Sequence, residues 1–78
     1  MNKAQKQLDS LPYFLRERIY KKLKWYLRHE DPLVFADKLT DFSLGEYRYR
    51  IGDYRVIFDV TEDLMRINRI GHRREIYR

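Results

Sequence analysis

The sequence predicts a single α+β domain over residues 1–78, in which an N-terminal helical hairpin packs on a three-stranded antiparallel β-meander. Apolar residues recur at every fourth position in the first part of the chain, a spacing typical of an amphipathic helix. The second half instead alternates apolar and charged residues, which is typical of strands with one buried face. Two turn-like pairs, Gly52-Asp53 and Glu62-Asp63, divide that half into strands.

Two helices are predicted before the strands. Residues 2–9 favour helix and are long enough for about two turns. Ser10 and Pro12 then signal the start of a second helix, since serine is a favoured N-cap and proline is tolerated in the first turn. We expect this helix over residues 12–28, and Pro32 ends the helical region. Its apolar stripe consists of Leu15, Ile19, Leu23 and Leu27.

The second half begins with an irregular segment and continues as a hairpin. Residues 33–44 show no regular period and predict an ordered connection with irregular turns. Strands are predicted over residues 47–51 and 54–60, and a two-residue turn between them places Arg50 directly opposite Arg55. Like charges that face each other across a ladder repel, so this arrangement favours an anionic ligand. The alternative is a solvated basic face.

The second turn sets the register of the last strand. A two-residue turn places Asp59 opposite Arg66, an attractive pair. The same register continues to Ile70 opposite Arg55. It would turn Arg69 into the core, so we expect a bulge or the end of regular pairing near this residue. The apolar pairs expected are Val60 with Met65 and Phe58 with Ile67.

The charge and composition of the chain indicate which kinds of molecule it could bind. The net charge of +5 suits a nucleic acid, an anionic membrane surface or an acidic protein. Arginine replaces lysine beyond Lys38, and guanidinium groups suit forked contacts with phosphates. The chain has no cysteine, and His29 lies far from His72, so we expect neither a metal nor a cofactor. Without a membrane-spanning run or a signal-peptide core, we expect a cytoplasmic protein with no membrane partner.

The residues that could carry chemistry gather around the predicted strands. Several cations on one concave surface suit phosphate binding, and a histidine and a tyrosine among them could transfer protons. For His72 alone, a structural role at the end of a strand is the alternative. On the second helix, Arg18 and Lys22 are candidate RNA contacts, with simple solvation as the alternative. The candidates at the sheet are Arg48, Arg50, Arg55, His72, Arg73, Tyr77 and, as an RNA contact, Arg74.

Two stretches resemble the RelE/ParE superfamily of toxins from type II toxin–antitoxin systems, and more closely its RelE branch. The first reads Leu-Gly-Glu-Tyr-Arg-Tyr-Arg-Ile-Gly-Asp-Tyr-Arg-Val-Ile-Phe from residue 44, and the second reads Arg-Ile-Gly-His-Arg-Arg-Glu-Ile-Tyr from residue 69. The resemblance implies a ribosome-dependent endoribonuclease (an mRNA interferase) that cuts mRNA in the ribosomal A site, where a ribose 2′-hydroxyl attacks the neighbouring phosphate. It also implies a cognate antitoxin, which we expect to be acidic and partly disordered because this chain is small and cationic.

The resemblance also implies roles for particular residues. Arg48 and Arg50 match basic residues, often lysines, that RelE toxins place beside the scissile phosphate. Arg55 matches the arginine after the hairpin tyrosine and would stabilise negative charge on the phosphorane. Arg73 matches a late-strand arginine that serves the phosphate or the leaving group. Tyr77 matches a C-terminal tyrosine that stacks on or orients the substrate base.

Two features depart from the family pattern. Arg48 stays protonated and is a poor general base, so either His72 transfers the proton or the mechanism relies on charge stabilisation and ribosomal alignment. Family members also open with a β-strand that this chain lacks. Either the start of the sequence is mis-set or truncated, or the sheet lacks a strand and exposes an edge. The alternatives to a ribonuclease are a ParE-type poison that binds DNA gyrase without cleaving RNA, and an inactive remnant that binds an antitoxin.

Overall fold

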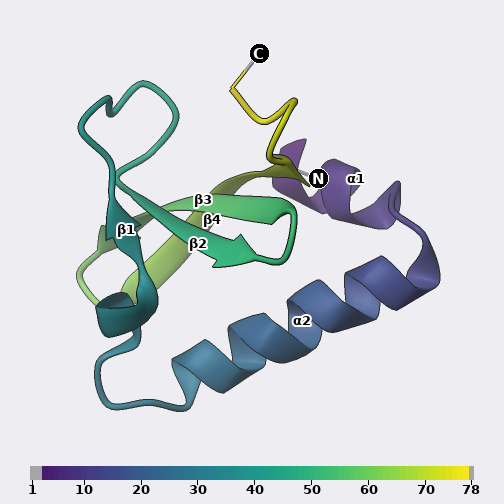
Figure 1. Cartoon of the computed structure of the whole chain (residues 1–78). Coiled ribbons are helices and arrows are strands. Elements are labelled where there is room, and N and C mark those ends of the chain that lie inside the picture. Colours follow the sequence, from purple (N-terminus) through teal and green to yellow (C-terminus); the bar gives the residue numbers. More distant parts are fainter. Residues whose placement is uncertain (1–2, 78) are drawn as a thin grey trace.

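The computed structural model describes residues 3–77 and has the predicted α+β architecture. Its elements are α1 (Lys3–Asp9), α2 (Tyr13–Leu27), a 3-10 helix η1 (Pro32–Phe35), β1 (Asp37–Lys38), β2 (Tyr47–Ile51), β3 (Tyr54–Thr61) and β4 (Leu64–His72). The four strands form one antiparallel sheet in the order β1-β2-β3-β4. The long helix α2 runs along the sheet, and α1 lies beside β4 (Figure 1).

Both predicted helices form, with ends close to those expected. α2 begins directly after Pro12, whose φ of −54° suits the start of a helix. The predicted capping role of Ser10 is wrong, because its hydroxyl donates to the carbonyl of Gln7 (2.7 Å) and so closes α1 instead. Asn2, the first residue of the predicted helix, lies outside the described residues. No helix within residues 3–77 is long and apolar enough to cross a membrane.

The segment between α2 and β2 is more regular than predicted. The carboxylate of Asp31 accepts a hydrogen bond from the N–H of Leu33 (3.1 Å) and so starts η1. After η1 the chain forms β1, which pairs with β2 and places Asp37 opposite Arg48. The sheet therefore has four strands rather than the predicted three. A strand of two residues is too short to produce an alternating pattern in the sequence.

The first hairpin has the predicted register throughout. Arg50 of β2 faces Arg55 of β3, and Tyr49 faces Val56 on the buried side. Gly52 adopts a φ of 59° in the turn, a conformation that glycine reaches without steric cost.

The predicted bulge is present in β4. The four pairs nearest the second turn have the expected register, and Asn68 is then the extra residue. Beyond it, Ile70 pairs with Val56 and not with Arg55, so that part of the prediction is wrong. The bulge moves Ile70 into the core and keeps the charged side chain of Arg69 on the opposite face.

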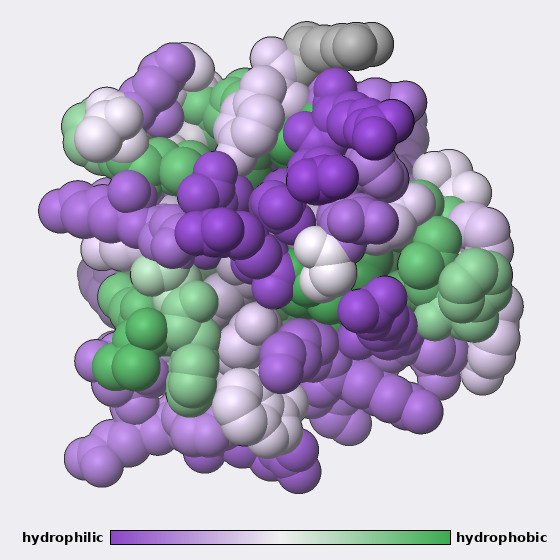
Figure 2. Space-filling model, viewed as in Figure 1, coloured by the Kyte–Doolittle hydropathy of each residue, from purple (hydrophilic) through white to green (hydrophobic). Residues whose placement is uncertain are grey.

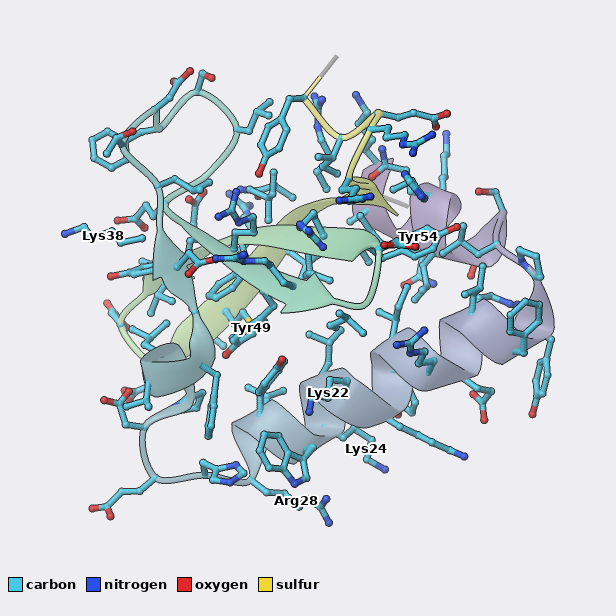
Figure 3. The ribbon with its side chains drawn as sticks, viewed as in Figure 1. Lys22, Lys24, Arg28, Lys38, Tyr49 and Tyr54 are labelled. Atoms are coloured by element: carbon cyan, nitrogen blue, oxygen red, sulfur yellow. The ribbon has the colours of Figure 1, made fainter. Side chains whose placement is uncertain are left out.

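The core centres on Tyr49, which is fully buried. Its ring stacks on Tyr26 of α2, with centroids 4.1 Å apart, and on Phe58 of β3, with centroids 4.7 Å apart. Its hydroxyl donates to the carbonyl of Pro32 (2.8 Å), so one side chain joins α2, β3 and η1 (Figure 3). Burial raises the pKa of Tyr49 to about 12, so the hydroxyl remains a donor at neutral pH.

A second, smaller apolar layer lies on the other face of the sheet. Ile57 of β3 is fully buried there. The loop of residues 39–46 covers it, and a Cβ added at Gly45 would lie only 2.6 Å from Cγ2 of Ile57. Ile76 of the C-terminal turn is also buried, over Gly71 of β4. This layer fixes the loop and the C-terminal turn against the sheet.

Helix α1 closes part of the free edge of β4. The side-chain oxygen Oε1 of Gln7 accepts a hydrogen bond from the N–H of Ile70 (2.8 Å). This N–H therefore points out of the sheet, where an edge strand would otherwise leave it unpaired.

We predict that Gly45→Ala lowers the free energy of unfolding by about 1–3 kcal/mol, the usual cost of overpacking a close contact. The new methyl would meet Cγ2 of Ile57 at 2.6 Å and the carbonyl oxygen of Phe58 at 3.2 Å, and both are fixed in β3. Gly71→Ala is the control, because its nearest neighbour is the terminal methyl Cδ1 of Ile76 at 3.2 Å, a less severe approach than the 2.6 Å at Gly45. Urea unfolding measures both variants. A Gly45→Ala variant as stable as the wild type would contradict the close packing of this loop.

Candidate functional site

Three arginines of the first hairpin lie on the face of the sheet opposite the Tyr49 core. Arg48 and Arg50 alternate with buried residues along β2, and Arg55 faces Arg50 from β3. Because side chains alternate across a strand, all three leave the sheet on the same side. Figure 2 shows hydrophilic side chains gathered across the middle of the molecule, over the sheet.

Asp37 of β1 contacts two of these arginines. Its Oδ2 accepts hydrogen bonds from Nε of Arg50 (2.8 Å) and from Nη2 and Nε of Arg48 (3.0 and 3.3 Å). These hydrogen bonds, with that of Arg50 the largest cause, hold the pKa of Asp37 below its usual value. The sequence pattern missed Asp37 because β1 is too short to be recognised. The available signal was the repulsion between Arg50 and Arg55, which calls for an anion nearby.

Tyr77 extends the cluster from the C-terminal turn. Its hydroxyl accepts a hydrogen bond from Nη1 of Arg48 (2.7 Å), so the Arg48 guanidinium bridges Asp37 and Tyr77. The Tyr77 residue is 50% exposed, which leaves part of its ring open to a ligand.

Arg55 lies close enough to the other arginines of the cluster to be repelled by them. Its Nη1 donates to the carbonyls of Gly52 and Tyr54, both at 2.9 Å, which holds the side chain over the turn. Partial burial first, and then repulsion by Arg48 and Arg50, lowers the pKa of Arg55. The site thus offers preorganised positive charge. Within residues 3–77, no group of three or more His, Cys, Asp or Glu side chains is placed to hold a metal ion.

The C-terminal candidates separate onto different sides of the sheet. His72 pairs with Tyr54 and lies on the side of α1, where its ring packs edge-on against Tyr54 and its Nδ1 accepts from the N–H of Arg74 (3.2 Å). The backbone N–H of Arg73 donates to the carbonyl of Asp53 (2.8 Å), and its Nε lies 3.6 Å from the Asp53 carboxylate. The structure therefore brings Arg73 to the first turn beside the arginine cluster, but it does not bring His72 there.

A basic groove of about 660 Å³ lies between α2 and the first turn. Arg18 and Lys22 of α2 line it with Arg28, the residue directly after the helix. Arg50 connects the groove to the arginine cluster. Trp25 lies at its side, with the Lys22 ammonium 4.3 Å from the indole centroid in a cation–π contact. The two helix candidates, Arg18 and Lys22, thus adjoin the arginine cluster through Arg50.

The fold is that of the small toxins of type II toxin–antitoxin systems. The family model described as "ParE toxin of type II toxin–antitoxin system, parDE" matches residues 1–77, so the chain belongs to this family, within the RelE/ParE superfamily. It is the toxin of a toxin–antitoxin module. The solved structure of a RelB–RelE antitoxin–toxin complex from Methanococcus jannaschii includes a similar chain, 25% identical, with a TM-score of 0.73 over 99% of this chain and 92% of that chain. The comparison with curated proteins gives no match.

We predict that Asp37 makes the stability of the sheet edge depend on pH. Since the folded-state pKa of Asp37 is lowered, its contribution is fully present above the unfolded pKa of about 3.9 and is lost as the pH falls through the folded-state value. Asp37→Asn should remove this loss. Between these pH values, the free energy of unfolding of the wild type should fall by up to about 1 kcal/mol more than that of Asp37→Asn. The difference is small because Asp37 and its arginine partners are partly exposed.

Urea unfolding of both proteins, from about pH 6 down to about pH 3, measures this difference. Asp63→Asn, an exposed change in the second turn, controls for the loss of one negative charge. Parallel pH curves for the wild type and Asp37→Asn would show that the contacts to the arginines contribute nothing.

Proposed function

We propose that this toxin is a ribosome-dependent endoribonuclease that cuts mRNA in the ribosomal A site. The observation that best supports this proposal is the gathering of Arg48, Arg50, Arg55 and Tyr77 on one face of the sheet. Fixed guanidinium groups bind a phosphate and stabilise the further negative charge of a phosphorane. A ribosomal target would place the protein in the cytoplasm.

In the proposed reaction, the ribose 2′-oxygen bonds to the neighbouring phosphorus while the bond from phosphorus to the 5′-oxygen breaks. The 2′-hydroxyl loses its proton and the departing 5′-oxygen gains one, which leaves a 2′,3′-cyclic phosphate and a 5′-hydroxyl. Arg48 and Arg55 stabilise the phosphorane, and Arg73, beside the first turn, serves the leaving group. Tyr77 orients the base next to the cut.

Charge stabilisation contributes more to this mechanism than proton transfer. Arg48 stays protonated, and the lowered pKa of Asp37 makes that carboxylate a weak base. His72 lies on the other side of the sheet, where its bond to the N–H of Arg74 supports the C-terminal turn. Alignment of the message by the ribosome then supplies the geometry for attack.

The basic groove would carry the RNA beyond the cleaved bond. Arg18 and Lys22 lie along α2, Arg28 follows directly after it, and Arg50 connects them to the cluster. Cations along a groove follow a nucleic-acid backbone without reading its sequence.

A second candidate function is a ParE-type poison that binds DNA gyrase and cleaves no RNA. The family match favours it, because the matching model describes ParE toxins. The same basic surface could then contact the nucleic acid or an acidic surface of the target.

We predict that Arg55→Ala reduces cleavage of mRNA on translating ribosomes by about a hundredfold or more, while ribosome binding changes much less. The side chain is preorganised by two backbone carbonyls and acts on charge that develops in the transition state. Arg66→Ala, which removes an exposed arginine from the far end of β4, is the matched control and should cleave normally. Mapping of mRNA ends after induction measures cleavage, and sedimentation with ribosomes measures binding.

The outcomes separate the candidate functions. Full cleavage by Arg55→Ala would contradict the proposed role of the cluster. Growth arrest with intact mRNA and trapped gyrase would replace the ribonuclease with the gyrase poison. Antitoxin binding without arrest or cleavage would indicate an inactive remnant.

We propose an acidic antitoxin as the partner of a second surface, an apolar groove between α1, α2 and β4. The groove has a volume of about 380 Å³ and is lined by Leu8, Leu23, Leu27 and Ile67, with Lys24 at its side. Leu27 remains 54% exposed in the isolated chain. An amphipathic segment with apolar anchors and acidic flanks would fill it and match the net charge of +5.

We predict that Leu27→Glu weakens binding of the cognate antitoxin by about tenfold or more, because it places a charge in the apolar groove. Phe14→Glu is the matched control, since Phe14 is 70% exposed on the same helix and lies outside the lining of the groove. Isothermal titration calorimetry measures both. Unchanged affinity in Leu27→Glu would mean that the antitoxin binds elsewhere.

A further inference from the structure

A second cavity adjoins the arginine cluster. It lies between the loop that joins β1 to β2 and the C-terminal turn, and its volume is about 210 Å³. Leu39, Asp41 and Leu44 line it from the loop, and Arg48 and Tyr77 line it from the other side. We call it the loop pocket. Pockets for drug-sized ligands begin at about 300 Å³, so the loop pocket suits a single planar ring system.

One wall of the loop pocket is an aromatic ring held in place. The hydrogen bond from Nη1 of Arg48 to the Tyr77 hydroxyl (2.7 Å) restrains the ring, which stays half exposed. Leu39 and Leu44 add apolar surface. An aromatic face with apolar neighbours is a platform for an unstacked RNA base, and Arg48 offers a contact for the phosphate beside that base. The combination suits a nucleotide.

The loop is anchored at its base, so the pocket exists before a ligand arrives. The N–H of Leu39 donates to the carbonyl of Glu46, and the N–H of Glu46 donates to Oδ1 of Asp59, both at 2.8 Å. The side-chain amide of Asn68, the bulge residue, donates to the carbonyl of Leu44 (3.2 Å) and to Oδ2 of Asp59 (2.9 Å). A preformed pocket loses little conformational entropy on binding.

Asp41 gives the loop pocket a preference among bases. Its Oδ1 accepts a hydrogen bond from the N–H of Ser43 (3.0 Å), and the hydrogen bonds with Ser43 lower the pKa of Asp41. An ionised carboxylate only accepts hydrogen bonds. Guanine presents two neighbouring donors, N1–H and the N2 amino group, on its Watson–Crick edge. Adenine, cytosine and uracil each present an acceptor next to a donor there, which a carboxylate repels.

We infer that the loop pocket binds the guanine base next to the phosphate held by Arg48, with Tyr77 against the ring and Asp41 on the Watson–Crick edge. This inference rests on the proposed RNA cleavage and adds the base that the site selects. An RNA cut by this toxin then carries a guanosine beside the cleaved bond.

Titration of the full chain with the four ribonucleoside 3′-monophosphates, followed by NMR, tests the inference. 3′-GMP should bind about tenfold or more tightly than the other three, with shifts centred on residues 39–44 and Tyr77, since a paired base edge discriminates by about that much. Asp41→Asn should abolish the preference. Asp63→Asn makes the same charge change in the exposed second turn and should retain it.

Equal affinities for the four nucleotides, or a guanine preference that survives Asp41→Asn, would overturn the inference. Mapping of mRNA ends separates this inference from the proposed function. Cleavage with no guanosine beside the cut overturns the guanine site and leaves the ribonuclease in place. Selective binding of 3′-GMP without any cleavage retains the guanine site and overturns the ribonuclease.

Discussion

The stacking of Tyr49 between Tyr26 and Phe58 joins α2 to the centre of the sheet and fixes which face of β2 is buried. Because side chains alternate along a strand, the burial of Tyr49 places Arg48 and Arg50 on the opposite face of β2. The hydrogen bond from the Tyr49 hydroxyl to the carbonyl of Pro32 holds η1, and β1 begins one residue after η1. The contacts that exclude water from one face of the sheet therefore determine the charge on the other.

On the arginine face, one carboxylate offsets part of the repulsion between the arginines, and a net positive charge remains. Asp37 accepts hydrogen bonds from Arg48 and Arg50, which offsets part of the repulsion that Arg50 and Arg55 exert across the ladder. The compensation is incomplete, because burial and then repulsion by Arg48 and Arg50 still lower the pKa of Arg55. The isolated domain can hold this arrangement without a ligand, and the remaining positive potential attracts polyanions.

The elements that arise from local sequence patterns could be predicted from the sequence. An element that depends on a single pairing between distant residues could not. Alternation and a glycine-containing turn set the first hairpin, so the pair Arg50 and Arg55 could be placed in advance. Asp37 could not, because a two-residue strand pairs with a segment about ten residues away without any periodic signal. His72 shows a third case. A bulge was predicted, but the extra residue, Asn68, turns every later side chain to the other face, and His72 moved with it.

The hydrogen bond between Gln7 and Ile70 bears on self-association. A sheet that ends in an open strand can recruit a strand from another copy and grow into a fibre. Here the outward N–H of Ile70 is already bound by a side chain of α1. A second copy that extended β4 at this point would first have to break that bond and move the helix. The first helix of this small toxin thus limits polymerisation of its own sheet.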